Sequence, residues 1–306
     1  MDGSLIIDKP EGITSHTVVA RVRRIAGTRR VGHAGTLDPF ATGVLVVCVG
    51  RGTRLSQFLV GLDKEYVATI RLGFATDTQD LTGKQITPLK SSYDRSLEDV
   101  RSVLDQFRGP QAQTPPMYSA KKVAGERLYR AARAGREVER QPVPINVYSI
   151  DLIDESANAL IVNQDGTRDF AVRVRCSSGT YIRTLAHDIG ERLGAGGHLA
   201  ALRRVAVGHF HISRAIGLEE LEQSGSRVVA SILIGMAETV IHLPTVELDS
   251  DAVKAVTNGR EIELLSEMTA TPGSPVRLLS QARQLVAIGD YDIARRVIKP
   301  RVVVHP

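Results

Sequence analysis

The chain has 306 residues, of which 42% are hydrophobic and 24% charged, an ordinary balance for a globular protein with a buried core. This length predicts one large domain and one small one. Lys and Arg number 39 against 34 Asp and Glu, so the net charge is +5, which allows a polyanionic partner without requiring one. No apolar run reaches the roughly 18 residues of a membrane span, and the first residues lack the basic region of a signal peptide.

The two cysteines, Cys48 and Cys176, lie in apolar or alternating strand patterns and do not form a C-x-x-C pair. We therefore expect buried, reduced thiols and a cytoplasmic protein. A first helix is predicted after Ser15, its expected N-cap, and should end at Gly27. Its apolar residues recur at helical spacing: Val18, Val19, Val22, Ile25 and Ala26.

Residues 31–43 form a glycine-rich turn that contains one carboxylate, Asp38. Gly32, Gly35 and Gly43 are expected to allow positive φ or close approach of a partner. A hairpin turn is the simplest interpretation, but thirteen residues are more than a hairpin needs. A carboxylate on a stiff loop next to a core strand is a candidate nucleophile, general base or electrostatic stabiliser.

Residues 66–72 alternate as a strand, with Tyr66 on one face and Arg71 on the other. The following loop, residues 76–83, contains Asp77 and Asp80 and is interpreted as a structural turn, since it lacks the pattern of a calcium loop. A second helix is predicted to begin after Ser96 with a capping box.

Residues 109–145 are rich in Pro, Lys and Arg and predict an exposed excursion from the core. A half-buried strand at 170–176 then turns into a helix that begins near Ile182 and ends at Gly194. Because helices and strands alternate irregularly, we predict an α+β fold with a mixed or antiparallel sheet. After Pro244 a compact tail of about 60 residues suggests a small barrel-like domain.

Several classes of site are disfavoured by missing motifs. The chain has no phosphate-binding G-x-x-x-x-G-K-[ST], no G-x-G-x-x-G and no G-x-S-x-G elbow. His209 and His211 have no third ligand near them in sequence, so a zinc site is not expected. We therefore predict no metal, and nucleotide-cofactor folds are disfavoured.

Two further side chains are candidates for chemistry on a base. Tyr66 would usually be a core aromatic, but it is flanked by charge in a chain with only 4% aromatic residues, which makes it a candidate stacking platform for a base. Arg183 is either a surface arginine or a cation that keeps a carboxylate ionised. Arginines also crowd before the glycine-rich turn and in the excursion, where they favour phosphate contacts over a merely solvated helix face.

Six sequence blocks occur in an order that resembles the TruB family of bacterial tRNA pseudouridine-55 synthases. The blocks are residues 8–15 (DKPEGITS), 32–39 (GHAGTLDP), 64–66 with 76–83 (KEY and TDTQDLTG), 115–122 (PPMYSAKK), 176–184 (CSSGTYIRT) and 202–204 (LRR). A weaker resemblance links residues 258–259, 285–289 and 299–300 to the family's C-terminal PUA-type RNA-binding module. The resemblance implies a pseudouridine synthase catalytic domain over residues 1–243, with residues 109–145 as an RNA-gripping insertion, and a PUA-like β-barrel over 244–306.

The resemblance implies that uridine 55 in the T loop of tRNA is isomerised to pseudouridine after base flipping, by a monomer that needs no guide RNA, cofactor or membrane. Asp38 would start cleavage of the glycosidic bond, either as nucleophile or as a base removing a sugar proton. Tyr66 would stack on the base and carry a proton, and Arg183 would pair with Asp38. His33 would fill the space left by the base. Further substrate-binding residues would be Gly35, Thr36, Leu37, Asp80, Tyr181 and Leu202. Contacts to the RNA backbone would come from Arg21, Arg24, Arg30, Lys121, Arg127 and Arg133.

Three alternatives stay open at this point. A guide-RNA-dependent synthase is disfavoured by the Cys-Ser-Ser-Gly turn and by the long basic insertion. An RNA-binding or RNA-folding module would not need Asp38. A glycosidic-bond hydrolase would need a second carboxylate, for which Asp80 is the nearest candidate.

Overall fold

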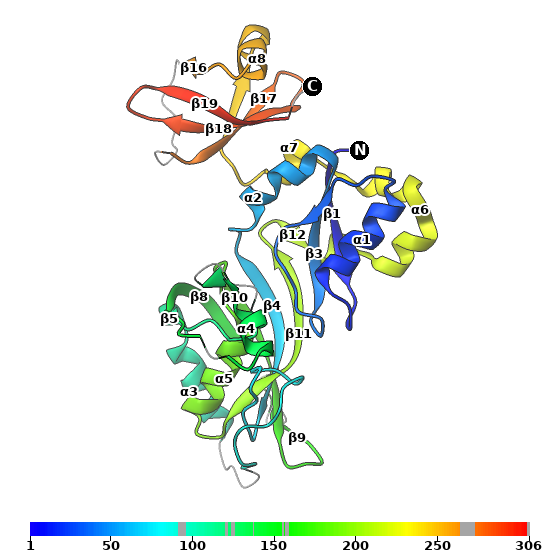
Figure 1. Cartoon of the computed structure of the whole chain (residues 1–306). Helices are drawn as coiled ribbons and strands as arrows, with labels where there is room; N and C mark the ends of the chain where they lie inside the picture. The colour runs from blue at the N-terminus through cyan, green and yellow to red at the C-terminus, as the bar shows by residue number, and fades with distance from the viewer. Residues whose placement is uncertain are drawn as a thin grey trace. The chain divides into compact units, whose positions relative to one another are not determined.

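The computed structural model describes residues 1–90, 96–119, 122–123, 126–136, 138–154, 156, 159–263 and 273–304. The chain divides into two compact units. Residues 1–38, 45–60 and 213–306 make the first unit, and residues 39–44 and 61–212 make the second. Figure 1 gives the labels of the helices and strands.

The strands, in chain order, are β1 (Gly3–Lys9), β2 (Val31–His33), β3 (Thr42–Val49), β4 (Lys64–Leu72), β5 (Gly109–Gln113), β6 (Lys122–Val123), β7 (Glu126–Arg127), β8 (Val143–Leu152), β9 (Ile161–Val162), β10 (Arg168–Cys176), β11 (Gly197–Val207), β12 (Phe210–His211), β13 (Ile216–Gly217), β14 (Ile234–Gly235), β15 (Thr245–Leu248), β16 (Ile262–Glu263), β17 (Pro275–Ser280), β18 (Leu285–Asp292) and β19 (Val297–Val303). The helices are α1 (Ser15–Ile25), α2 (Ser56–Leu59), α3 (Leu97–Gln106), α4 (Leu128–Arg133), α5 (Ile182–Arg192), α6 (Leu218–Ile232), α7 (Met236–Thr239) and α8 (Ser250–Thr257), with two 3₁₀ turns at Gly50–Leu55 and Ile212–Arg214.

In the first unit, α1 and α6 pack on one side of β1 and β3 (Figure 1). The core there is aliphatic and includes Leu5, Val18, Leu45 and Leu221, each fully or almost fully buried. The predicted first helix is confirmed, but its N-cap is Thr14, whose hydroxyl accepts a hydrogen bond from the Thr17 N–H at 3.1 Å. Ser15 is instead the first helical residue, which leaves its hydroxyl available for another partner.

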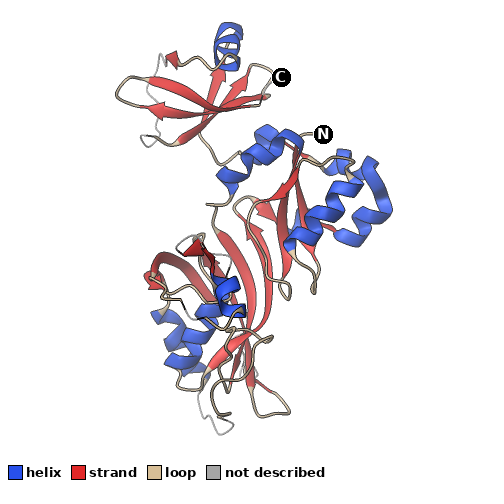
Figure 2. Cartoon of the chain, in the orientation of Figure 1, coloured by secondary structure: helices blue, strands red, loops and turns tan. Residues whose placement is uncertain are grey.

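The second unit is built on antiparallel strands in the order β11-β4-β10-β8-β5, and β11 also pairs in parallel with the first residues of β3. Buried and half-buried residues alternate along β4 as predicted, with Tyr66, Ala68 and Ile70 inward and Arg71 half-buried. Helices α3 and α5 lie against this sheet (Figures 1 and 2). The capping box predicted at Ser96 is present, with Asp99 as its second member. The α+β prediction is therefore confirmed.

One predicted boundary is wrong. The excursion was expected over residues 109–145, but Gly109–Gln113 forms β5 and pairs with β8, which begins at Val143. Both ends of the expected segment are therefore hydrogen-bonded to each other within the sheet. This limits the excursion to the residues between β5 and β8, 114–142. The prediction from composition missed this because charge and proline content do not report strand pairing.

The C-terminal residues have a core of their own, which includes Leu248, Val256, Val276, Val286 and Ile298. Their strands run in the order β15-β17-β18-β19-β16, and the apolar side of α8 packs on them. Among the described residues this path is open, because β15 and β16 do not pair with each other, so the closed barrel stays a prediction.

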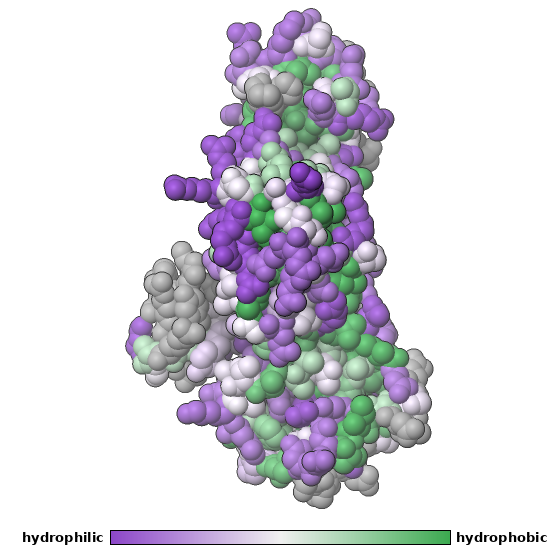
Figure 3. Space-filling view, turned by 90° about the vertical axis from the view of Figure 1, so that its right-hand side faces the viewer, coloured by the Kyte–Doolittle hydropathy of each residue, from purple (hydrophilic) through white to green (hydrophobic). Residues whose placement is uncertain are grey.

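Both cysteines are buried and free, as predicted. Burial raises the pKa of Cys48 to about 12 and that of Cys176 to about 11, so neither is a thiolate at neutral pH. Hydrophilic side chains predominate on the face drawn in Figure 3, with hydrophobic ones in smaller patches between them. Within the described ranges, no helix is both long and apolar enough to cross a membrane.

Candidate active site

The loop that carries Asp38 belongs to the first unit and is held by Ser15. The Ser15 hydroxyl accepts a hydrogen bond from the Leu37 N–H at 2.9 Å and donates one to the Leu37 carbonyl at 3.1 Å. Ser15 is 1% exposed and Leu37 is 4% exposed, so water does not compete for these bonds. Both polar groups of Leu37, the residue before Asp38, are thus fixed by one side chain. Gly35 takes a φ of +99°, a left-handed value that favours glycine in this loop.

His33 ends β2 and meets His16 of α1 edge to face, with ring centroids 5.3 Å apart and planes at 84°. Thr36, in contrast, is exposed. Gly32 was expected to allow positive φ or close approach of a partner, and it does not use the positive φ. It lies in β2 with an ordinary φ, and an added Cβ would meet nothing within 4 Å.

Gly43, by contrast, is required by the approach of β3 to β11. Its φ is +99°, and an added Cβ would lie 2.2 Å from the Arg204 carbonyl oxygen. Arg204 is 2% exposed, and its Nε donates to the Val44 carbonyl at 2.7 Å. The absence of a side chain at Gly43 allows β3 and β11 to approach each other. The hydrogen bond from Arg204 to Val44 then helps to hold them in parallel pairing.

Tyr66 lies on the inner face of β4 with 8% of its surface exposed. Ala68, two residues after Tyr66 on β4, pairs with Leu202 of β11. Leu202, like Tyr66, is 8% exposed. Lys64, two residues before Tyr66, is buried and donates from Nζ to the Leu62 carbonyl at 2.6 Å. Burial and the charge of Arg204 lower the pKa of Lys64 to about 8. The inner face of β4 is therefore a low-dielectric environment beside the candidate stacking residue.

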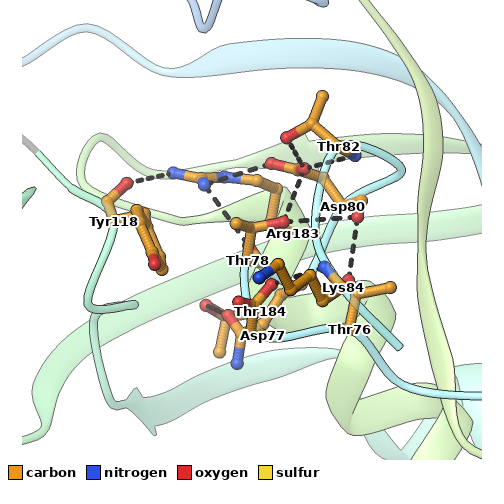
Figure 4. Close-up of polar contacts among 10 residues, drawn as sticks. Thr76, Asp77, Thr78, Asp80, Thr82, Lys84, Tyr118, Arg183 and Thr184 are labelled. Atoms are coloured by element: carbon orange, nitrogen blue, oxygen red, sulfur yellow. Dashed lines mark hydrogen bonds and ion pairs between the residues drawn. The ribbon is translucent and has the colours of Figure 1, made fainter. Parts of the chain in front are cut away.

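Arg183 is the second residue of α5, and its guanidinium is buried in a polar network (Figure 4). Nη1 lies 3.2 Å from Asp80 Oδ2, and both side chains are at most 6% exposed. Nη2 donates to the Tyr118 carbonyl at 2.9 Å. The pair therefore joins the turn after β4 to the start of α5.

The Asp80 carboxylate is saturated on its other oxygen as well (Figure 4). Oδ1 accepts from the Thr78 hydroxyl at 2.7 Å and from both the N–H and the hydroxyl of Thr82 at 2.9 and 2.6 Å. Gln79 beside it has a φ of 63°, and its Oε1 accepts from the Thr184 hydroxyl at 2.8 Å. The predicted structural turn is confirmed, and its carboxylate holds an arginine.

Tyr181 precedes α5 as its N-cap residue. Its backbone N–H and carbonyl are both bonded by the side chain of Gln113, at 2.8 and 3.0 Å. The sequence offered no signal for this contact, because it joins residues that are 68 positions apart and leaves no local pattern.

The residues predicted to contact the RNA backbone differ in their exposure and in how far the structure describes them. Arg24 and Arg30 are exposed near the end of α1 and before β2. Arg21 lies 3.6 Å from Glu222 of α6, a partly exposed ion pair. Lys121 lies outside the described residues, and Arg127 and Arg133 are described in their backbone only.

Metal binding has no support in the described part of the chain, where no three His, Cys, Asp or Glu side chains gather as ligands.

Two stretches of the chain match models of known protein families. Residues 23–182 match the N-terminal domain of the TruB family pseudouridylate synthases, and residues 183–230 match the C-terminal domain of tRNA pseudouridylate synthase B. The chain belongs to the TruB family.

Curated relatives carry the same family name. A tRNA pseudouridine synthase B of Geobacillus thermodenitrificans is 41% identical over 304 residues, which cover 98% of either chain. One of Opitutus terrae is 48% identical over 222 residues, covering 72% of this chain and 88% of the relative.

Solved structures with this fold come from a Cbf5-Nop10-Gar1 complex and from an H/ACA RNP bound to a substrate RNA containing 2′-deoxyuridine. Their matching chains are 28% and 26% identical, with TM-scores of 0.77 and 0.76. Each match covers 99% of this chain and 85% of the other. The fold of this TruB family member is thus a pseudouridine synthase fold.

The structure places the predicted residues in two sets. His33, Gly35, Thr36, Leu37 and Asp38 belong to the first unit, and Tyr66, Asp80, Tyr181, Arg183 and Leu202 to the second. Sequence reasoning missed Ser15 as a support of the Asp38 loop, Gln113 as a partner of Tyr181, and Asp80 as a partner of Arg183.

Proposed function

We propose that this TruB family member isomerises uridine 55 in the T loop of tRNA to pseudouridine. Family membership and the names of relatives at 41–48% identity support this proposal. The observation that carries it is the fixation of the Asp38 loop. A purely structural turn does not need the two hydrogen bonds with which Ser15 fixes the backbone of Leu37, immediately before the carboxylate.

The reaction rearranges atoms without exchanging electrons. The bond between C1′ and N1 of the uracil breaks, the base turns, and a bond between C1′ and C5 forms. The proton leaves C5, and N1 gains one. Asp38 starts the cleavage either by attacking the nucleoside as a nucleophile or by removing a sugar proton as a base. No redox cofactor enters this balance.

Tyr66 is proposed to stack on the target base and to carry a proton, and its low exposure on β4 suits a contact that excludes water. We propose that Arg183 keeps the Asp38 carboxylate ionised near the reacting base. The pairing of Arg183 with Asp38 stays a prediction. Asp80 was predicted to bind substrate. With both of its oxygens occupied, we propose instead that it holds Arg183 in place.

Access to the base requires its extrusion from the stack, which costs a few kcal/mol and is least costly in a loop. His33 is proposed to fill the space that the base leaves. Phosphate contacts from Arg24, Arg30 and the basic residues of the excursion would supply affinity that depends strongly on salt.

A guide-dependent synthase is the second candidate, because the structural neighbours named above come from complexes of that type. The stand-alone form is favoured by the higher identity of the tRNA pseudouridine synthase B relatives, 41–48% against 26–28%. Incubation with a bare tRNA transcript, without other proteins or RNA, separates the two candidates. Conversion supports the stand-alone enzyme, and conversion only after adding a guide RNA overturns it.

The catalytic assignment is tested with Asp38→Asn, which removes the carboxylate charge at nearly constant size. We expect unchanged tRNA binding in a gel-shift titration and loss of pseudouridine in chemical mapping of the tRNA. Asp251→Asn, an exposed carboxylate on α8, is the matched control and should keep full activity. Near-normal conversion by Asp38→Asn would leave a binding module as the better interpretation, and release of free uracil by the native chain would indicate a hydrolase.

A further inference from the structure

Gln113 closes a two-bond ring with the backbone of Tyr181. It is the last residue of β5 and 3% exposed. Its Oε1 accepts from the Tyr181 N–H at 2.8 Å, and its Nε2 donates to the Tyr181 carbonyl at 3.0 Å. A carboxamide offers a donor and an acceptor side by side, as the N–H and C=O of one residue in a neighbouring antiparallel strand do. The contact joins residues that are 68 positions apart in the chain.

The ring lies at the start of α5. Tyr181 is the N-cap of that helix, and its own side chain makes no capping bond. Its carbonyl also accepts the helical bond from the Leu185 N–H at 3.0 Å. The Gln113 side chain therefore fixes both backbone polar groups of the residue from which the helix begins, a contact distinct from an ordinary cap, which accepts from N–H groups of the first turn.

The same segment touches α5 a second time. Five residues after Gln113, the Tyr118 carbonyl accepts from Arg183 Nη2 at 2.9 Å. The first turn of α5 is thus held from one side by residues 113–118 and from another by Asp80. The residues held are Arg183, which has a role in the proposed function, and Tyr181, which the family resemblance names as substrate-binding.

We propose that Gln113 is a positioning residue for pseudouridine formation, acting by fixing Tyr181 and, through the start of α5, Arg183. This inference rests on the proposed roles of those two residues. A misplacement of reacting groups by about 1 Å costs about 100-fold in rate. Affinity for tRNA comes mainly from phosphate contacts elsewhere. Loss of the ring should therefore slow the isomerisation and leave tRNA binding in place.

The test compares Gln113→Ala and Gln113→Glu with Gln111→Ala. Gln113→Glu keeps the size and the acceptor for the Tyr181 N–H but sets a carboxylate against the Tyr181 carbonyl. Gln111 lies on the same strand, and its amide donates to the Phe107 carbonyl and not to the first turn of α5. With release of tritium from C5-labelled uridine in tRNA as the readout, we expect kcat to fall about 10- to 100-fold in both Gln113 variants. We expect KM to stay within about threefold of the native value and Gln111→Ala to resemble the native chain.

Amide hydrogen exchange supplies a readout that does not depend on activity. Peptides covering residues 181–186 should exchange faster in both Gln113 variants and at the native rate in Gln111→Ala. If the alanine variant fails to fold, the glutamate variant, which has the native size, still decides the question.

The outcomes separate this inference from the proposed function. A native chain that forms no pseudouridine would overturn the function itself, and an Arg183→Lys variant with native kcat would overturn the role of Arg183. If the native chain is active and Arg183→Lys is slow, native kcat in the Gln113 variants overturns the positioning role alone. A raised KM with unchanged kcat would overturn it too, because Gln113 would then act in tRNA binding.

Discussion

Ser15 shows how the role of one residue changes between sequence and structure. As a serine before an apolar helical pattern it was expected to be the N-cap, but Thr14 takes that position. The Ser15 hydroxyl then lies buried against the Leu37 backbone, immediately before the candidate catalytic carboxylate. The Ser15 hydroxyl therefore stabilises the loop before Asp38 and does not cap the helix.

Replacing Ser15 with Ala leaves the buried Leu37 N–H without its acceptor, which costs about 1–3 kcal/mol and loosens the backbone before Asp38. We expect kcat for pseudouridine formation to fall by about 10- to 100-fold with little change in KM, measured by steady-state kinetics. Ser4→Ala is the matched control, since Ser4 is also buried and bonds the Thr239 hydroxyl at 2.8 Å. Equal loss of activity in the two variants would indicate a general loss of stability instead.

Asp80 is a charged residue whose partner, like that of Ser15, is given only by the tertiary structure. Two acidic residues in a polar turn predicted no particular partner, and the local hydrogen bonds to Thr78 and Thr82 are those of an ordinary turn. Only the packing of α5 brings Arg183 to within 3.2 Å of its second oxygen. A buried pair of this kind is costly to break from one side, because the remaining charge is left unpaired.

At the scale of single elements, local patterns were reliable guides. The alternation along β4, the capping box of α3 and the apolar face of α5 all lie where the sequence placed them. Each of these signals comes from residues within one helix or one strand. The ends of the excursion were not predictable in this way, since β5 pairs with β8 across about thirty intervening residues.

The first residues of β11 supply a pH-dependent test. His198 is 2% exposed, and its Nδ1–H donates to the Phe74 carbonyl at 3.0 Å. Burial lowers the pKa of His198 and Arg71 lowers it further, while the hydrogen bond to the Phe74 carbonyl, Asp169 and Asp80 oppose the shift. The unfolded chain therefore binds a proton at His198 more readily than the folded one. Its contribution to stability is complete above pH 6.5 and is lost as the pH falls below that value.

We accordingly expect His198→Asn, which keeps a donor near the position of Nδ1, to show a weaker decline of unfolding free energy between about pH 6.5 and 5. The difference should be at most about 1.4 kcal/mol per pH unit, measured by urea denaturation at each pH. His211→Asn, an exposed histidine on β12, should keep the native slope. An unchanged slope in His198→Asn would contradict the assignment of this titration to His198.

At the scale of the whole molecule, the excess of basic residues is modest, and it is their placement that favours tRNA as a partner. Arg24 and Arg30 are exposed and border the segment that leads to Asp38. Arg21 is partly engaged by Glu222, so it is a weaker candidate for phosphate. Charge that is both exposed and close in sequence to the candidate catalytic loop suits RNA-backbone contacts that set register without reading bases.

The combined change Arg24→Gln and Arg30→Gln should weaken tRNA binding and flatten its salt dependence. The slope of log K against log salt concentration is expected to fall by about 0.7–0.9 for each phosphate that the variant no longer neutralises, measured by filter binding over a salt series. Arg214→Gln is a fitting control, because Arg214 is paired with Glu238 at 2.9 Å. An identical salt slope in the double variant would remove these arginines from the RNA interface.

The sequence by itself determined the fold class, the family and most elements, because these depend on patterns within short segments and on motifs in a fixed order. It also singled out Asp38, Tyr66 and Arg183 as candidates. Only the tertiary structure decided which groups lie around them. Ser15 reaches Leu37 across 22 residues, Gln113 reaches Tyr181 across 68, and Arg183 reaches Asp80 across 103. Such contacts form when separate elements pack and bury their polar groups together, and no local pattern encodes that meeting.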